Sequence, residues 1–387
     1  MPTASRRRRL LVLSALTGAF WLVGSPALAQ EASDGRGPCP DVGLSKNLAA
    51  LSASGLYSDI ENKVIAEGNL LYAPAHTLWS DAATKRRWIR LPEGAQIDVT
   101  NPDYWDFPVD TRIWKEFTAT VDGKGNPLPA PVLVETRILL KLESGWFEMA
   151  YEWLDDYSDA CPVPDGTTDT MEVGWSVPSQ DQCMACHRDG ATDADDGRTI
   201  DPPLSFSGIL LNHPLEGDEQ VNLQTLLDDG RLSGPVDPAA LVIPSREGFE
   251  ALDRDALGYL HANCGSCHAQ HGAASNTAFN AWLTADKLGS VAETPTGAAI
   301  DGDSLSWSYV KPYLIDTQKH EESCVYDRMN RRDGVHMPPF GTALVDDAGV
   351  ALILEWIKSL ENDDAAAIRK EDGKALIQRG RDLKRSR

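Results

Sequence analysis

The chain has 387 residues and carries 36 basic against 58 acidic side chains, a formal net charge of −22 at pH 7. Charge of this sign repels phosphate groups, which excludes a nucleic acid as a partner and makes anionic lipid surfaces unfavourable. The length and a hydrophobic content of 42% leave room for two or three packed cores.

The amino terminus has the three parts of a secretory signal peptide. Arg6–Arg9 are cationic, Leu10–Leu22 is mostly apolar, and Ala27-Leu28-Ala29 is a small-residue cleavage site. The apolar run is too short and interrupted for a stable membrane span, so an uncleaved anchor is only the alternative. We predict that residues 1–29 are a signal peptide cleaved near Ala29 and that the mature chain is periplasmic. Its net charge is then about −26, because four arginines are removed.

Residues 38–180 are predicted to form a β-rich domain. A short helical pattern over 44–56 comes first, and segments that alternate apolar and polar residues follow. These segments are 87–91, 111–117, 132–142 and 146–153. Seven of the 11 Trp lie between residues 79 and 175. In half-buried strands such a density favours the filling of an antiparallel β core, and a platform for carbohydrate or aromatic ligands is the alternative.

Two five-residue runs share the form C-x-x-C-H: Cys183-Met184-Ala185-Cys186-His187 and Cys264-Gly265-Ser266-Cys267-His268. Two thiols three positions apart can add to the vinyl groups of one porphyrin, and the adjacent imidazole then becomes the proximal iron ligand. The runs therefore predict two haem c groups, attached through Cys183 and Cys186 and through Cys264 and Cys267. His187 and His268 are the predicted iron ligands.

A bare C-x-x-C pair also occurs in zinc sites and in redox dithiols. The two pairs have enough sulfur to pool four ligands around one zinc ion. Neither alternative explains why a histidine directly follows the second cysteine in both runs, so haem is favoured. Residues 181–245 are accordingly predicted as the first haem-binding region, with a short helix over 221–228 and a linker that contains Gly and Pro.

The second motif has a different frame. An amphipathic helix over 249–263 runs into Cys264, and a second helix over 348–360 has apolar positions three and four apart. A helix into C-x-x-C-H, a methionine loop and a closing helix resemble a small class-I cytochrome c fold. We predict an all-α cytochrome c-like domain over 246–362 and a charged tail over 363–387, which makes the chain an α+β multidomain protein.

Met337 is the predicted sixth ligand of the second iron. It stands in the run Val335-His336-Met337-Pro338-Pro339, where two prolines restrict the loop and can hold a thioether toward a metal at low entropic cost. Thioether ligation raises the reduction potential, which suits an electron carrier. Met329 and His336 are the competing candidates.

The sixth ligand of the first iron stays open at this point. His213 lies 26 residues after His187 and precedes Pro214, which makes it the nearest plausible imidazole. Met171, His76 and an iron with no protein ligand at the sixth position are the alternatives.

Three cysteines remain outside the two motifs. An oxidising compartment favours pairing, and Cys324 sits in a short amphipathic pattern over 321–329 where a buried thiol is the ordinary explanation. Cys39 and Cys161 are therefore the predicted disulfide.

Several runs give the chain a resemblance to a family of exported bacterial two-haem c-type cytochromes of undefined substrate. The runs are Thr77-Leu78-Trp79-Ser80-Asp81, Lys85-Arg86-Arg87-Trp88, Val134-Glu135-Thr136-Arg137, Pro178-Ser179, Met337-Pro338-Pro339-Phe340-Gly341-Thr342 and Glu355-Trp356-Ile357. The resemblance covers about residues 40–362 and implies haem binding and electron transfer. Its C-terminal runs are shared by many cytochrome modules, and the N-terminal runs are more distinctive. One departure is His213, which stands where the family usually has a basic residue and so weakens a family-wide ligand role.

Two functions follow as hypotheses. The first is a periplasmic electron carrier with two haems, for which the acidic surface predicts a redox partner protein with a basic docking surface. The second is a di-haem oxidoreductase of peroxidase type, in which a Met337-ligated haem feeds an open first haem. The sequence supplies no distal acid or base constellation for peroxide chemistry, which favours electron transfer. A structural module in which the β domain recognises a ligand is the third reading.

Overall fold

The computed structural model describes residues 39–187, 203–270, 272–277, 279–291, 294 and 313–360. The predicted signal peptide and charged tail lie outside these residues, and the described residues all belong to one compact unit. The strands are β1 (Tyr57–Asp59), β2 (Val64–Ile65), β3 (Leu70–Tyr72), β4 (Thr84–Arg90), β5 (Arg112–Val121), β6 (Pro127–Leu142), β7 (Gly145–Trp153), β8 (Ala160–Pro162), β9 (Thr167–Thr170) and β10 (Trp175–Val177). The helices are α1 (Gln180–His187), α2 (Gly208–Leu211), α3 (Leu223–Asp228), α4 (Glu250–Cys264), α5 (Cys324–Met329) and α6 (Asp347–Ser359).

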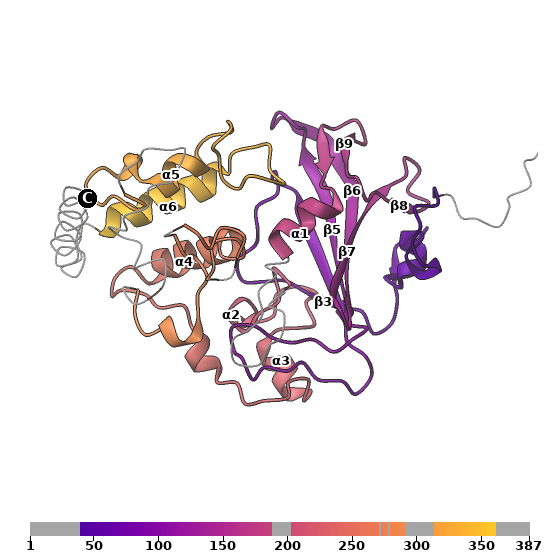
Figure 1. Cartoon of the computed structure of the whole chain (residues 1–387), viewed down its shortest axis with the longest axis horizontal. Coiled ribbons are helices and arrows are strands. Elements are labelled where there is room, and N and C mark those ends of the chain that lie inside the picture. The colour runs from indigo at the N-terminus through magenta and orange to yellow at the C-terminus, as the bar shows by residue number, and fades with distance from the viewer. Residues whose placement is uncertain are drawn as a thin grey trace, which may run out of the picture. The chain divides into compact units, whose positions relative to one another are not determined.

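A six-stranded antiparallel sheet is the centre of the fold (Figure 1). Its strand order is β3-β4-β5-β6-β7-β8, so each strand pairs with its neighbour in the sequence. The predicted strands over 87–91, 111–117, 132–142 and 146–153 are confirmed as β4 to β7. Strict alternation of side chains gives this sheet two faces of different chemistry.

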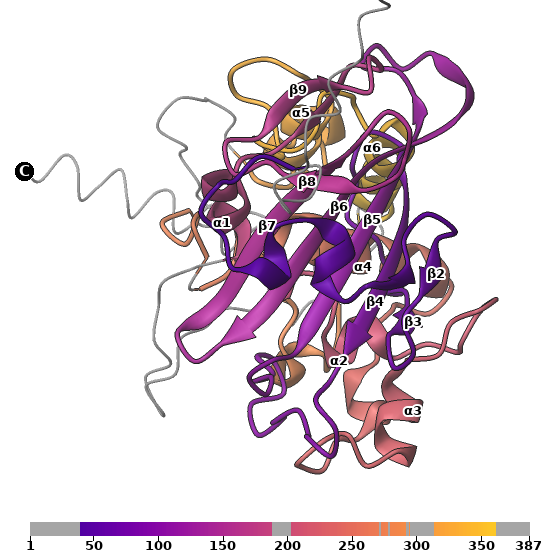
Figure 2. The same cartoon turned by 90° about the vertical axis from the view of Figure 1, so that its right-hand side faces the viewer.

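One face of the sheet is lined by aromatic side chains and faces the N-terminal segment, drawn in indigo in Figure 2. Trp88, Trp114 and Trp153 are each at most 2% exposed on this face. The tryptophans therefore fill a β core, as predicted. The helical pattern over 44–56 forms two short 3-10 helices, Lys46–Leu48 and Leu51–Ser54, whose leucines pack on the tryptophans.

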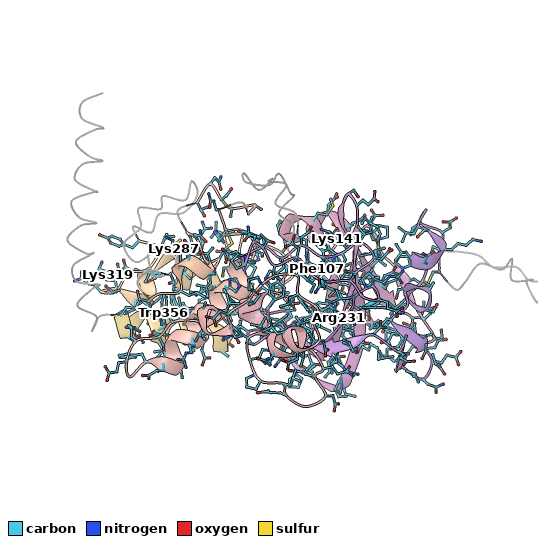
Figure 3. The ribbon with its side chains drawn as sticks, turned by 90° about the horizontal axis from the view of Figure 1, so that it is seen from below. Phe107, Lys141, Arg231, Lys287, Lys319 and Trp356 are labelled. Atoms are coloured by element: carbon cyan, nitrogen blue, oxygen red, sulfur yellow. A yellow bond between two sulfur atoms is a disulfide. The ribbon has the colours of Figure 1, made fainter. Side chains whose placement is uncertain are left out.

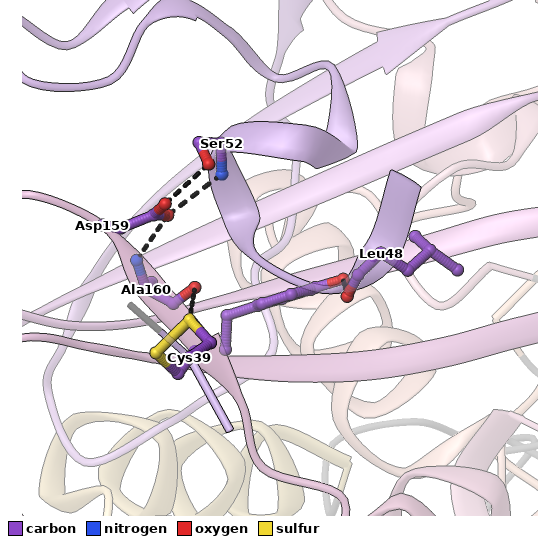
Figure 4. Close-up of a disulfide and its surroundings, with 7 residues drawn as sticks. Cys39, Leu48, Ser52, Asp159 and Ala160 are labelled. Carbon is purple, nitrogen blue, oxygen red and sulfur yellow. Dashed lines mark hydrogen bonds between the residues drawn. A yellow bond between two sulfur atoms is a disulfide. The ribbon is translucent and has the colours of Figure 1, made fainter. Parts of the chain in front are cut away.

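The predicted disulfide is confirmed. Cys39 and Cys161 are bonded, with their Cα atoms 5.2 Å apart, and the bond fastens the N-terminal segment to β8 (Figure 4). Beside it, the Asp159 carboxylate accepts hydrogen bonds from the Ser52 hydroxyl at 2.6 Å and from the Ser52 and Ala160 amides at 3.0 and 2.7 Å. Cys324 is buried at the start of α5, as expected for a thiol inside a packed region.

The other face of the sheet shares one continuous core with the C-terminal helices. Tyr72 and Trp146 from the strands belong to the same buried cluster as Leu257 of α4 and Trp356 of α6. Figure 3 labels Trp356 together with Phe107, another member of this cluster. The predicted fold class is therefore wrong in its last part, because the described residues contain no independent all-α cytochrome c-like domain.

The physical reason lies in the lengths of the helices. The predicted helices α4 and α6 are present, but they are the only ones longer than eight residues in the described part of the chain. Two such helices cannot enclose a core by themselves, and their apolar residues join residues of the strands in one buried cluster. The predicted domain boundaries stay predictions. The expectation of a separate all-α core over 246–362 is wrong.

A buried ion pair fixes the two long helices to each other. The Asp253 carboxylate of α4 is fully buried, and it accepts hydrogen bonds from Arg246 at 2.6 Å and from the Trp356 indole at 3.1 Å. The Arg246 guanidinium also donates to the Ser359 hydroxyl at the end of α6 at 2.7 Å. Among the described residues no helix is long and apolar enough to cross a membrane.

Candidate functional site

The first C-x-x-C-H run occupies α1, which begins directly after β10 and packs against β7 (Figures 1 and 2). Cys183 and His187 are half-buried, and the side chain of Cys186 lies outside what the structure describes. Burial raises the pKa of the Cys183 thiol. Burial, together with the positive charges of Lys115 and Arg137, lowers the pKa of His187 to about 3. The imidazole is therefore neutral at pH 7, which is the form that binds iron.

The strand register next to α1 brings three basic side chains together. Arg87 of β4 pairs with Lys115 of β5, and Lys115 pairs with Arg137 of β6, so the three side chains stand in one row on one face. Arg137 forms a two-pronged ion pair with the fully buried Glu135, at 2.6 and 2.9 Å. We call Arg87, Lys115 and Arg137 the cationic row.

The second C-x-x-C-H run begins at the last residue of α4. His268 Nδ1 lies 3.1 Å from the Thr277 hydroxyl oxygen, and that hydroxyl donates its proton to the Ala274 carbonyl at 2.8 Å. Because the hydroxyl has only one proton, His268 Nδ1 must be the donor in its contact with the Thr277 oxygen. This assigns the proton to Nδ1 and leaves the Nε2 lone pair available for a metal.

The cysteines lack the character of a redox dithiol. Burial and the neighbouring Cys267 raise the pKa of the Cys264 thiol to about 12, whereas a reactive cysteine has a lowered pKa. Among the described residues no group of three or more His, Cys, Asp or Glu side chains is arranged to hold a metal ion. A zinc site pooled from the two motifs therefore has no support in the described part of the chain.

The three methionine-loop candidates differ in their surroundings. Met329 is 7% exposed and belongs to the main core, and His336 is bonded through Nδ1 to the Asp333 carbonyl. Met337 is half-buried, and its amide donates to the Arg328 carbonyl at 2.9 Å. The charge of Arg328 also acts on His268, whose pKa is lowered first by burial and then by this charge. The Met337 loop and His268 are thus both close to Arg328.

Residues 77–81, which we call the strap, connect the second motif to the Met337 loop. On one side, the Trp79 amide donates to the side-chain oxygen of Asn263 at 2.6 Å, and the Asn263 amide group donates to the Thr77 carbonyl at 3.2 Å. Asn263 directly precedes Cys264. This side of the strap therefore holds the end of α4, where the second C-x-x-C-H run starts.

On its other side the strap holds the chain that returns from Met337. The Asp81 carboxylate accepts hydrogen bonds from the amides of Ala343 and Leu344 at distances between 2.8 and 3.0 Å. The Trp79 indole donates to the Leu344 carbonyl at 3.2 Å. Three hydrogen bonds to one carboxylate and one from an indole fix the base of the loop relative to α4.

The candidates for the sixth position of the first iron are engaged elsewhere. His213 Nδ1 contacts the Pro214 carbonyl at 2.8 Å and its Nε2 contacts the Ala73 carbonyl at 2.9 Å, so iron binding requires one contact to break. Met171 packs against a cluster that includes Phe117 and Trp175. The His76 ring presses so closely on Gly258 of α4 that a Cβ atom there would lie 2.2 Å from it.

A pocket of about 530 Å³ lies beside helix α1. Gln182 of α1 lines it together with residues 341–343 from the Met337 loop and Gly166 beside β9. Helix α1 and the Met337 loop therefore border the same pocket.

Sequence reasoning missed the roles of two groups of residues. Lys115 carries no motif signal, because its place in the cationic row depends on strand register. Trp79 and Asp81 fall in a run that the resemblance singled out, but nothing in the sequence shows which segments this run contacts. The one sequence feature that could have drawn attention to Asn263 is its position directly before Cys264.

Comparison of the chain with family models, with curated proteins and with solved structures finds no match.

Proposed function

We propose that this protein is an exported two-haem c-type cytochrome that transfers electrons. The repeated C-x-x-C-H motif carries the proposal, and the geometry around His268 supports it. The Thr277 hydroxyl oxygen accepts a hydrogen bond from His268 Nδ1, which leaves the Nε2 lone pair available. An iron-binding histidine needs this arrangement. The Cys39–Cys161 disulfide supports a location in an oxidising compartment.

The residues at both motifs fit the group that the motif implies. Cys183, Cys186 and His187 would hold the first haem, and Cys264, Cys267 and His268 would hold the second. His187 has a buried Nδ1 without a hydrogen-bond partner in the described structure, which a firmly packed structural histidine seldom has. When bound, haem c supplies an iron that exchanges one electron at a time.

The chain's own residues set the properties of the second site. The Thr277 hydroxyl orients the His268 ring, and Met337 offers a thioether, which favours the reduced metal. The strap and Arg332 hold the base of the Met337 loop, because the Arg332 guanidinium donates to the Leu344 carbonyl at 2.5 Å. A fixed ligand pair limits reorganisation during electron exchange. The acidic surface favours a redox partner with a basic docking surface.

A di-haem oxidoreductase of peroxidase type is the second candidate. The observation that favours it is the engagement of both His213 ring nitrogens with backbone carbonyls, which leaves the first iron without its nearest candidate ligand. An iron with an open position binds small molecules, whereas a six-coordinate iron exchanges electrons only.

One preparation of the mature protein tests both candidates. The mass of the denatured chain should exceed the mass of the polypeptide by two haem groups, and the haem absorbance should stay with the protein through acid-acetone extraction. An unmodified mass after expression with a working haem-attachment pathway would overturn the proposal. Carbon monoxide added to the reduced protein then separates the candidates, since two six-coordinate irons ignore the gas and an open iron binds it quickly.

A further inference from the structure

The cationic row is unusual in a chain with such an excess of acid. Arg87, Lys115 and Arg137 stand side by side on three neighbouring strands, and Lys85 precedes Arg87 by two positions on the same face of β4. Cross-strand neighbours of like charge destabilise a sheet. Burial and the surrounding positive charges hold the pKa of Lys115 well below its usual value. The sheet therefore bears a local electrostatic cost on this face.

Only part of this charge is balanced within the described residues. Glu135 neutralises Arg137, as its two hydrogen bonds show, and the second buried carboxylate on this face, Glu148, belongs to β7, three strands from Arg87. Arg87 is 2% exposed, and its Nε and Nη2 atoms have no hydrogen-bond partner among the residues that the structure describes. Lys115 contacts the Phe117 ring, with its ammonium 4.8 Å from the ring centre, and forms no ion pair with any described residue. A buried guanidinium without a counter-charge costs several kcal/mol, so the site calls for an anion.

The position of the cationic row indicates which anion binds there. Helix α1 packs against β7, next to the strand that carries Arg137. The Gln180 amide group of α1 donates to the Glu148 carbonyl of β7 at 2.9 Å, and Ala150, two positions further along β7, pairs with Arg137. A group held by this motif therefore lies within electrostatic reach of the row. Haem carries two carboxylates on its propionate arms.

We propose that Arg87 and Lys115 form a carboxylate-binding site and that its occupants are the propionate groups of the first haem. This inference rests on the proposed function. The planar Arg87 guanidinium suits a two-pronged contact with a carboxylate, and the Lys115 ammonium adds a point charge beside it. The same two cations stabilise the iron state with the smaller positive charge. The row thus raises the reduction potential of the first haem without supplying an iron ligand.

The test uses the mature holoprotein and the variant Lys115→Met. A matched control is Lys124→Met, which removes the same charge from an exposed position in the turn between β5 and β6. Both variants should keep two haem groups by mass. In a spectropotentiometric titration Lys115→Met should lower the potential of the first haem and leave that of the second nearly unchanged, and Lys124→Met should shift neither. Equal potentials of the first haem in the two variants would overturn the proposal.

Two further measurements identify the occupant. Arg87→Met should lower the potential of the first haem in the same direction. Succinate added to the wild type should leave this potential unchanged, because the propionates already fill the site. A succinate-dependent shift that Lys115→Met abolishes would assign the site to a free carboxylate and overturn the propionate assignment.

A failure of the proposed function has a different signature. If the mature protein carries no haem, succinate should raise the Tm of the wild type and not that of Lys115→Met. This result would support a carboxylate-binding site at Arg87 and Lys115 but not the haem proposal. Equal Tm responses in the two proteins would overturn the site as well.

Discussion

The two C-x-x-C-H motifs have the same pattern and different surroundings. The first lies on a helix of eight residues beside a sheet face that carries the cationic row. The second begins at the last residue of a helix of 15 residues. The Thr277 hydroxyl, Asn263 and the strap form hydrogen bonds around it. The difference teaches that a motif defines which atoms attach the cofactor, while the residues packed around it define the electrostatics. We therefore expect the two haems to differ in potential and in ligation.

The largest effect should come from the attaching cysteines. Cys183→Ala and Cys264→Ala should each disrupt the attachment of one haem, because a single remaining thiol forms one covalent link instead of two. Intact-mass measurement gives the number of haem groups per chain. Cys324→Ala is the matched control, since this buried cysteine lies outside both motifs. Loss of both haems in each single variant would show that the sites are not independent.

The second effect should be confined to the second haem. Met337→Ala should remove the weak red charge-transfer band of a ferric methionine-ligated haem and lower that potential, because a thioether favours the reduced metal. The first haem should keep its potential, and the fold should survive because the remaining attachments stay in place. Visible absorption and spectropotentiometry measure both quantities. An unchanged band in Met337→Ala would remove Met337 as the ligand.

Met329→Ala tests the same comparison through its effect on the free energy of unfolding. Met329 is 7% exposed within the main core, so its truncation should cost about 2 kcal/mol of unfolding free energy by leaving a cavity. The red band and both potentials should stay nearly unchanged. Denaturant unfolding followed by far-UV circular dichroism measures the cost. Loss of the band here, with retention in Met337→Ala, would exchange the roles of the two methionines.

The sequence predicted the elements well and their assembly poorly. Period-two alternation identified β4 to β7, and apolar spacing identified α4 and α6, because these patterns are local. The apolar face of α6 was visible, but the buried cluster that it shares with residues of the strands was not, so Trp356 was assigned to a domain of its own. Cys39 and Cys161 paired as predicted, since only three cysteines lay outside the motifs.

The same limit applies to the candidate site. C-x-x-C-H is a contiguous signal and needs no fold to be read. Lys115 acquires its neighbours only through the register of three strands, and Asp81 contacts Leu344 across 263 positions of sequence. Such contacts depend on tertiary packing, which single-sequence periodicity does not encode.

The smallest effect should come from the strap, and it tests whether the surroundings of the second motif act on ligation. Asp81→Asn removes the charge from three hydrogen bonds at the base of the Met337 loop. Weaker bonds should cost the loop about 1 to 2 kcal/mol. The ratio of methionine-bound to methionine-free iron should then fall about 5- to 30-fold. On heating, the red band should disappear at a lower temperature than in the wild type, well before the circular dichroism signal of the sheet.

Asp98→Asn provides the control, because Asp98 also accepts bonds from a backbone amide and a hydroxyl, both of Thr100, in a loop away from the strap. It should leave the temperature at which the band is lost unchanged. If Asp81→Asn lowers the melting of the band and of the sheet by the same amount, the strap contributes only to general stability. If the band is lost first, the strap is a positioning element that keeps Met337 at the iron. The surroundings of the second motif then act on ligation, whereas those of the first act through charge.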